Sequence, residues 1–310
     1  MKAALFALLL FAQPTRAGWA DYSSLVVADK TAAGSPSAGA IRITYLGVNG
    51  YQLEAGAHAL LIDPYFTRVS LWRAAFNRPI VPNSGRISAG LSHVHQRVDA
   101  VLVTHAHFDH LLDVPQVMER TGAQLVADES AANLVQALGV APVKCSVVNP
   151  GNRKRIGPWK ISVLAAQHDR VIGSTPPYPG IVSRPATPPV KPSDWKLGRP
   201  LAFVIEANNQ RIYIDSGGVP DDPPPALEKI DLAILGVALP DSRRRFVSAA
   251  RALRPRYILP SHQDDFFVPF KRGFTFGRLT NFPQVLRMHD GGELPGRLIL
   301  LDYFRPWTIR

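Results

Sequence analysis

The chain has 310 residues and a formal net charge of +11 at pH 7. Apolar residues make up 46% of it and charged residues 19%, which is ordinary globular composition and excludes the disordered class. This length is compatible with one large α/β or sandwich fold. The sequence therefore predicts a single domain over residues 38–310.

The N-terminus has the pattern of a secretory signal. Lys2 precedes an apolar run from Ala3 to Ala12, and small residues follow near Ala17. We expect a signal peptide over residues 1–17, with cleavage as late as residue 20, and export to the periplasm or outside the cell. A membrane anchor is the alternative, but a span needs about 20 apolar residues. No other segment of the chain is long enough to cross a membrane. Determining the N-terminal residue of the mature protein tests this expectation, because cleavage would leave a chain that begins between residues 18 and 21.

The first half of the mature chain begins with strands. Residues 18–37 are small and polar and are expected to form a loose leader. Short apolar or alternating runs then predict strands in AIRITYLG (40–47), YQLEA (51–55) and HALLIDPYF (58–66). A helix is predicted in DESAANLVQALG (128–139), with Asp128 as its N-cap and Gly139 just beyond its end. Residues 67–97 look like an irregular insertion.

The second half repeats this order of strands before helices. Strands are predicted at 159–168, 201–208, 210–218, 231–237, 256–262 and 296–304, and helices at 241–254 and 281–290. Residues 171–200 contain eight prolines and are expected to form an extended loop, of the kind that often serves as a lid or binding loop. Two sheets with helices outside would bury this pattern, which predicts an α/β (α+β) class.

One short stretch concentrates the candidate chemistry. VLVTHAHFDHLLDVP (101–115) places three of the nine histidines and an aspartate directly after an apolar run. Alternate side chains share a face of a strand, so His105 and His107 are expected to point the same way. A tight loop would turn Asp109 and His110 toward them. Imidazole and carboxylate together suit zinc, and with less selectivity iron or manganese. Four donors this close indicate two neighbouring metals, whereas a chance surface cluster is the alternative.

Four other apolar runs end in a candidate ligand. They end at Asp63, His168, Asp215 and His262. Each is weak alone, because a histidine at a strand end is usually structural and an aspartate before glycine usually forms a turn. Cys145 is the only cysteine, so thiolate sites and intrachain disulfides are excluded. The candidate ligands are therefore histidines and carboxylates.

Together these motifs resemble the metallo-β-lactamase superfamily. The sequence THAHFDH, followed at long intervals by a histidine, an aspartate and a final histidine, is similar to that superfamily's motif set over roughly residues 41–304. The layout is most similar to the branch of ascorbate-6-phosphate lactonase and N-acylphosphatidylethanolamine phospholipase D. The resemblance implies an αββα sandwich with two metal ions, zinc by default, at its edge. Departures after His168, at Ser216 and after His262 leave the substrate undefined.

The resemblance also implies a role for each residue. His105, His107 and His168 would hold one metal, Asp109, His110 and His262 the other, and Asp215 would bridge them. Asp63 would fix a histidine by a hydrogen bond. Two cations sharing a water would yield hydroxide, oriented by Asp109, which acts as the catalytic residue. The substrate-binding candidates are Tyr178, Phe266, Lys271 and Arg272.

The expected reaction is hydrolysis of an ester, lactone, amide or phosphodiester in a small or lipid-like substrate, with anionic substrates among the options. Residues from Pro240 onward contain 13 Lys and Arg against 6 Asp and Glu, and such a basic surface attracts anions or serves solubility. A metallo-nuclease is the first alternative, although no stacking motif or basic stripe indicates a nucleic-acid partner. A β-lactamase and a non-catalytic binding protein are the others. Nothing in the sequence indicates an oligomeric state.

Overall fold

The computed structural model describes residues 18–30, 34, 36, 39–170, 175–185, 187–218, 229–277, 279–291 and 294–309. The predicted signal peptide, residues 1–17, lies outside the described residues, so export stays a prediction of the sequence. Within the described part of the chain, no helix has the length and apolar character that crossing a membrane requires.

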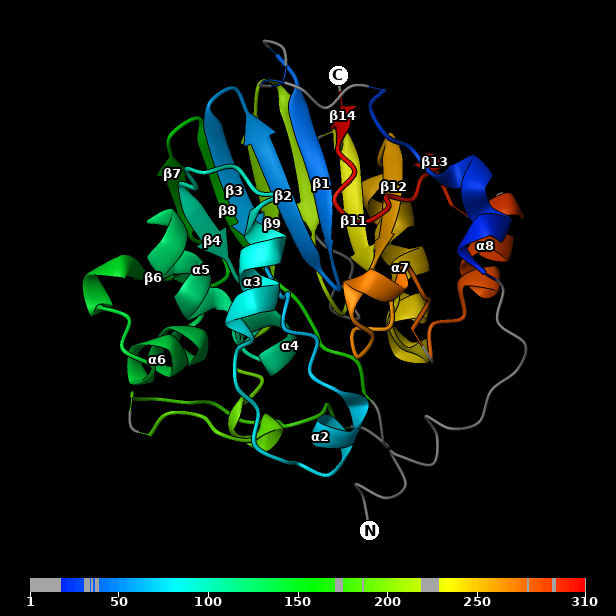
Figure 1. Cartoon of the computed structure of the whole chain (residues 1–310). Coiled ribbons are helices and arrows are strands. Elements are labelled where there is room, and N and C mark those ends of the chain that lie inside the picture. Colours follow the sequence, from blue (N-terminus) through cyan, green and yellow to red (C-terminus); the bar gives the residue numbers. More distant parts are fainter. Residues whose placement is uncertain are drawn as a thin grey trace.

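The described residues form two mixed sheets of seven strands each (Figure 1). The strands of the first sheet are, in spatial order, β14 (Trp307–Ile309), β1 (Ile41–Gly47), β2 (Gly50–Ala55), β3 (His58–Ile62), β4 (Ala100–Leu102), β5 (Gln124–Ala127) and β6 (Cys145–Val147). Those of the second are β13 (Arg297–Leu298), β12 (Tyr257–Ser261), β11 (Leu232–Gly236), β10 (Gln210–Ile214), β9 (Leu201–Ala207), β8 (Trp159–Ala165) and β7 (Arg153–Ile156).

Helices cover the outer faces of both sheets (Figure 1). The α-helices are α2 (Leu71–Ala75), α3 (Ser84–Leu91), α4 (Phe108–Leu111), α5 (Val114–Thr121), α6 (Glu129–Ala137), α7 (Pro240–Leu253) and α8 (Phe282–Asp290). Short 3-10 helices are η1 (Trp19–Leu25), η2 (Pro142–Lys144), η3 (Pro192–Asp194) and η4 (Phe270–Arg272). α3, α5 and α6 lie against the first sheet, and α7 and α8 against the second.

The alternation of side chains along the strands produces three apolar layers. Leu60 and Ile62 of β3 point into the layer between the sheets, whereas Leu61 points outward beneath the helices of the first sheet. On β10, Ile214 likewise faces inward and Tyr213 faces α7. Central strands such as β9 and β11 are covered on both faces and are therefore almost entirely apolar. The predicted αββα sandwich is confirmed.

The predicted helices have the ends that their capping residues indicate. Asp128 accepts hydrogen bonds from the amides of Ser130 and Ala131 at the start of α6. Asn281 accepts one from Gln284 at the start of α8. On α7 the stripe Phe246, Ala249, Ala250 and Leu253 is buried against the second sheet, as expected.

Three segments differ from expectation. The first part of the expected loose leader is packed, since Trp19 of η1 stacks on Phe274 with ring centroids 3.9 Å apart and Tyr22 is buried. The insertion at 67–97 contains α2 and α3, which Ser70 and Asn83 cap. The last predicted strand, 296–304, is paired as β13 only at Arg297–Leu298, and β14 closes the first sheet instead.

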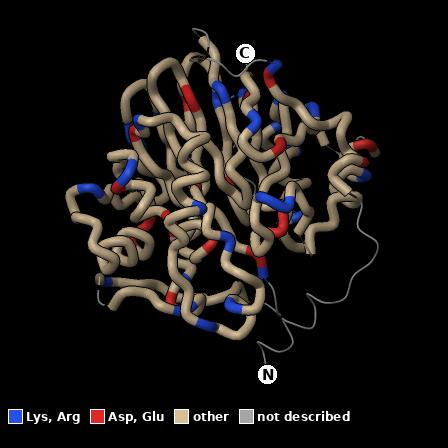
Figure 2. The backbone as a smooth tube through the Cα atoms, in the orientation of Figure 1, with Lys and Arg blue, Asp and Glu red and all other residues tan. Residues whose placement is uncertain are grey.

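The basic residues are spread over the molecule. Figure 2 shows Lys and Arg on both halves of the sandwich, interspersed with Asp and Glu. Part of the positive surplus after Pro240 is internal, because Arg243 and Arg245 of α7 are buried. These two arginines therefore contribute to the structure around α7 and not to a basic surface.

Candidate metal centre

The candidate ligands meet because the strands that precede them end at one edge of the sandwich. β3 and β4 run parallel in the first sheet, and β10, β11 and β12 run parallel in the second. β8 has the same direction as β10, since both are antiparallel to β9 between them. The residues after β3, β4, β8, β10 and β12 therefore reach the same edge, where sites of open α/β sheets are commonly built.

The histidine motif leaves β4 as a short turn and a short helix. His105 follows the strand, and His107 is the N-cap of α4. Asp109 and His110 lie inside α4, where the negative charge of Asp109 suits the first turn. Two backbone hydrogen bonds hold this turn, one from Ala106 to the Leu197 carbonyl of the proline-rich segment (3.1 Å) and one from Leu201, the first residue of β9, to the Thr104 carbonyl (2.8 Å). The motif is thus fixed from both sides.

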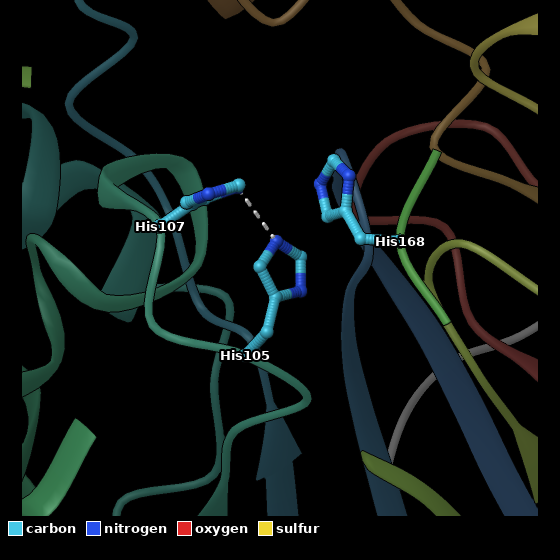
Figure 3. Close-up of side chains that lie close together, drawn as sticks. All are labelled: His105, His107 and His168. Carbon is cyan, nitrogen blue, oxygen red and sulfur yellow. Dashed lines mark hydrogen bonds between the residues drawn. The ribbon is translucent and has the colours of Figure 1, made fainter. Parts of the chain in front are cut away.

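Two groups of three donors form at this edge. Within each group the candidate ligand atoms all lie within 4.8 Å of one another. The first group contains His105, His107 and His168, whose rings converge in Figure 3. The second contains Asp109, His110 and His262. The rings of His105 and His110 are 3.9 Å apart between centroids, so the two groups are adjacent. The structure therefore brings together six of the seven predicted ligands.

Backbone carbonyls orient two of the rings. His107 Nε2 lies 3.0 Å from the carbonyl oxygen of Pro177, and His168 Nδ1 lies 2.9 Å from that of Asp169. A carbonyl can only accept a hydrogen bond, so each of these nitrogens carries the ring proton. The other nitrogen of each ring is left as a lone pair that faces the group. Such outer hydrogen bonds are typical of metal-binding histidines.

Side chains orient two further rings. His110 Nδ1 lies 2.8 Å from Asp63 Oδ2, and the same carboxylate accepts hydrogen bonds from the Thr104 hydroxyl (2.5 Å) and from the Asn49 amide (2.9 Å). Asp63 is thus placed where its predicted orienting role requires. Ser216 Oγ lies 3.1 Å from His105 Nδ1 and gives that ring an outer partner.

Burial sets the protonation of the first group. It lowers the pKa of His105 and His107 well below the usual value and lowers that of His168 to about 4. These rings are therefore neutral at pH 7, the form that offers a lone pair to a metal.

The second group is electrostatically paired. Burial would lower the pKa of His110, but the carboxylates of Asp109 and Asp63 outweigh it and raise the pKa to about 10. Burial would likewise raise the pKa of Asp109, but His110 and His262 hold it well below its usual range. Asp109 is therefore a carboxylate at every pH at which the protein is expected to work.

The low pKa of His168 predicts that the metal-free protein is acid-sensitive. An unfolded chain protonates this ring near its ordinary pKa of 6.5, whereas the folded chain protonates it only near 4. Between these values the unfolded state binds the additional proton, so acidification lowers the free energy of unfolding, by about 3 kcal/mol from His168 alone. Urea unfolding of chelator-treated protein at a series of pH values measures this. In His168→Gln the part of the acid-induced fall in unfolding free energy that comes from His168 should vanish. An acid dependence equal to that of the wild type would contradict the low pKa assigned to His168.

The donor atoms fit a pair of cations. His105 Nε2 and His107 Nδ1 face each other at 3.1 Å. In the tautomer that carries the His105 proton on Nδ1, directed to Ser216, both nitrogens present lone pairs to which a cation can bind. In the second group Asp109 Oδ2 lies 3.5 Å from His110 Nε2 and 3.2 Å from His262 Nε2. His110 Nε2 is buried with no hydrogen-bond partner, and a cation bound there would replace the ring proton that the neighbouring carboxylates favour in the metal-free chain. A set of nitrogen and carboxylate donors is typical of zinc and acceptable to iron and manganese.

Asp215, predicted to bridge the two metals, belongs to neither group. It is buried directly after β10, and its Oδ1 accepts hydrogen bonds from the amides of Gly218 and Gly236, both at 3.1 Å. Burial, despite these hydrogen bonds, raises the pKa of Asp215 to about 6. The side chain orders the turn that presents Ser216 to His105, and its bridging role stays a prediction.

Two of the four predicted substrate-binding residues lie at the site. The ring of Tyr178 approaches His107 edge-on at 6.0 Å, and that of Phe266 approaches His262 at 5.4 Å. Lys271 and Arg272 are exposed on η4 and have no described contact with either group. Aromatic rings thus flank the two groups, whereas the predicted cationic patch does not reach them.

A buried ion pair fixes the loop that carries His262. Arg68 and Asp264 are both fully buried, with Nη2 2.7 Å from Oδ2, and Phe270 lies beneath the guanidinium at 4.1 Å. Asp264 also accepts a hydrogen bond from the Val48 amide (2.9 Å), and the Val48 carbonyl accepts one from His262 (2.8 Å). The pair therefore joins the segment after β3 to the segment after β12.

Backbone strain accompanies the candidate ligands. Asp63 has a φ of 41°, Tyr178 of 41° and His262 of 54°, all in the left-handed region that residues other than glycine rarely adopt. Such strain costs about 1–3 kcal/mol per residue and persists where the surrounding contacts enforce it. At Asp63 and His262 it turns the chain sharply at the strand end and aims each side chain into the site.

Sequence reasoning missed several residues around the groups. Ser216, Pro177, Arg68 and Arg245 touch or support the candidate ligands, but all act across long sequence separations. The apolar spacing of α7 offers one signal for Arg245, because it lies four residues before Ala249 and therefore on the same buried face of the helix. The other contacts have no local signature.

Known proteins share both this sandwich and this sequence pattern. A UPF0173 metal-dependent hydrolase from Rubrobacter xylanophilus is 28% identical over 244 residues, which cover 74% of this chain and 85% of the relative. The solved structure of Igni18, a metallo hydrolase from Ignicoccus hospitalis, superposes with a TM-score of 0.57 at 16% identity, covering 87% of this chain and 99% of that one.

A further structure widens the chemistry found on this fold. CmlA, a diiron β-hydroxylase from Streptomyces venezuelae, has a TM-score of 0.55 at 13% identity and covers 89% of this chain and 55% of that one. At such identities the solved structures show the shared fold alone. Residues 58–262 match the family described as the β-lactamase superfamily domain. Because this match spans more than half of the chain, the chain belongs to that family and is a metal-dependent hydrolase of the metallo-β-lactamase fold.

Proposed function

We propose that the protein is a hydrolase with two zinc ions, acting on an ester, lactone, amide or phosphodiester. The observation that carries this proposal is the pair of adjacent donor groups, one of three histidines and one of Asp109, His110 and His262. When bound, two such cations supply Lewis acidity, which generates a nucleophile from water at neutral pH and polarises the substrate oxygen. Iron, as in the diiron neighbour, and manganese are the alternative metals.

The residues of the chain would divide the remaining work. His105, His107 and His168 would hold one ion as neutral ligands, and His110 and His262 with Asp109 would hold the other. Asp109 is ionised and its side chain is 10% exposed, so it can accept a hydrogen bond from an attacking water and orient it. Thr104 and Asn49 would keep the Asp63 carboxylate aimed at His110.

The aromatic flanks support a substrate with an apolar part. Tyr178 stands beside the first group and Phe266 beside the second, so a scissile bond between the groups would have an apolar ring on each side. An acyl or aryl group next to the bond would bury apolar surface there, at about 25 cal/mol per Å². The predicted cationic residues Lys271 and Arg272 have no described contact with either group, so the described residues give the nuclease alternative little support.

A hydrolase panel with the metal removed and restored tests the proposal. Protein loaded with zinc should hydrolyse at least one member of a panel of lactones, acyl esters, acyl-phospholipids and phosphodiesters. Complete removal of metal by a strong chelator should abolish that activity, because no described side chain in the site can replace the Lewis acid. Added zinc should restore it. Activity that survives verified metal removal contradicts the proposed mechanism.

A further inference from the structure

Arg245 of α7 is buried beside the candidate metal centre. Its side chain is 1% exposed, and its guanidinium is fully engaged. Nε and Nη2 both donate to the carbonyl of Gly217, at 3.2 and 2.6 Å, and Nη2 also lies 3.5 Å from Asp169 Oδ1. Nη1 donates to Asp241 Oδ2 at 2.5 Å, one turn earlier on the helix. Burying a charge in this way is costly, so the contacts have a structural purpose.

The two turns that Arg245 holds both belong to the first donor group. Asp169 follows His168 directly. Gly217 follows Ser216, whose hydroxyl lies 3.1 Å from His105 Nδ1. One side chain therefore contacts the turn that presents His168 and the turn that orients His105.

These turns pack against each other without spare room. The amide of Gln167 donates to the carbonyl of Gly218 at 2.9 Å. A Cβ atom on Gly217 would lie 2.6 Å from the carbonyl oxygen of Gln167 and 3.0 Å from the Cα of His168. A Cβ on Gly218 would lie 2.8 Å from Arg245 Nε. A shift of either turn is therefore transmitted to the other. The guanidinium of Arg245 packs against both turns and limits their movement further.

We propose that Arg245 is a positioning residue for the His105–His107–His168 group, holding the two turns so that the three imidazoles converge on one cation. This inference rests on the proposed metal centre. The planar guanidinium reaches Gly217, Asp169 and Asp241 at once, which the single ammonium of a lysine cannot do. The second group has its own support in the Arg68–Asp264 pair, so loss of Arg245 should affect only the first.

The test measures zinc affinity in two backgrounds that each retain one group. His262→Ala leaves the three-histidine group intact, and His168→Ala leaves the other. Arg245→Lys is added to each, and zinc affinity is measured by competition with a chromophoric chelator. In the His262→Ala background we expect affinity to fall about 10- to 100-fold, the usual effect of losing an outer support. In the His168→Ala background it should stay within about 2-fold, because the described contacts of Arg245 reach Gly217, Asp169 and Asp241 and none of the second group's ligands. Unchanged affinity in the first background, or equal losses in both, overturns the proposal.

Controls separate positioning from folding. Arg244→Lys changes the exposed neighbour on the same helix, 62% exposed at its side chain, and should leave zinc affinity unchanged in both backgrounds. Circular dichroism and urea unfolding show whether Arg245→Lys is folded. If it is not, Ser216→Ala removes only the hydroxyl beside His105 and should weaken zinc in the His262→Ala background alone. Retained affinity in that variant then overturns the proposal. A wild-type chain that binds no zinc contradicts the proposed function itself, which distinguishes the two failures.

Discussion

Replacing His107 by alanine should abolish hydrolysis and leave the fold in place. The imidazole supplies one of three neutral donors in the first group, and its lone pair is directed inward by the hydrogen bond to the Pro177 carbonyl. The two histidines that remain are one fewer than the three protein ligands that a catalytic zinc site uses. We expect kcat/KM to fall by at least about 10³-fold, since the Lewis acid stabilises the transition state by several kcal/mol.

The same substitution should have a small effect on the stability of the metal-free protein. His107 follows β4 outside the apolar layers, and its loss removes a buried polar ring that burial keeps uncharged. Urea unfolding of chelator-treated wild type and variant gives this comparison. His289→Ala is the matched control, because that ring lies at the end of α8 and hydrogen-bonds the Gly296 carbonyl. Near-wild-type turnover in His107→Ala would show that the histidine cluster is not the active centre.

Replacing Asp264 by alanine should cause the largest loss of stability. The substitution leaves Arg68 charged, fully buried and without its carboxylate, and it deprives the Tyr303 hydroxyl and the Val48 amide of their acceptor. Removing one partner of a buried pair costs about 3–5 kcal/mol. The free energy of unfolding from urea titration measures this. Double replacement of Asp264 and Arg68 by apolar residues should recover part of the loss, because no unpaired charge then remains.

An ion pair whose lysine is exposed to solvent provides the control for that prediction. Lys229 lies 3.6 Å from Asp231 with its side chain 82% exposed. Exposed pairs contribute about 0–1 kcal/mol, so Lys229→Ala should leave the free energy of unfolding within that range. A loss in Asp264→Ala as small as the one in Lys229→Ala contradicts the structural role assigned to the buried pair.

Local patterns predict many of the strands and the helices α6, α7 and α8, but they do not predict α2, α3, α4 or α5, nor the short strands β5 and β6. β1, β2 and β3 alternate or cluster apolar residues over short runs, and α6 has both an N-cap at Asp128 and a glycine beyond its end. α3 has one local signal, because the Asn83 side chain caps it by accepting a hydrogen bond from the Arg86 amide. Its sequence has too few apolar residues to mark a buried face, so that signal alone did not predict the helix. The short polar strand β7 has no apolar alternation that would distinguish it from a loop.

The residues of the candidate site also fall into those that local sequence predicts and those that it does not. His105, His107, Asp109 and His110 are close in sequence, and their grouping follows from the strand that precedes them. The meeting of His168 and His262 with them depends on which strand ends share an edge, which only the resemblance indicated. The bridging role of Asp215 likewise comes only from the resemblance and stays a prediction, since its Oδ1 accepts hydrogen bonds from the amides of Gly218 and Gly236 and the side chain is in neither group.

Each donor group takes two ligands from the first sheet and one from the second. A gene divided between β6 and β7 would therefore encode two polypeptides, neither of which has three donors for either group. Each fragment alone would be inactive as a hydrolase, and only their reassociation would restore catalysis. The architecture is thus suited to a split reporter, in which hydrolysis reports that two fused partners have met.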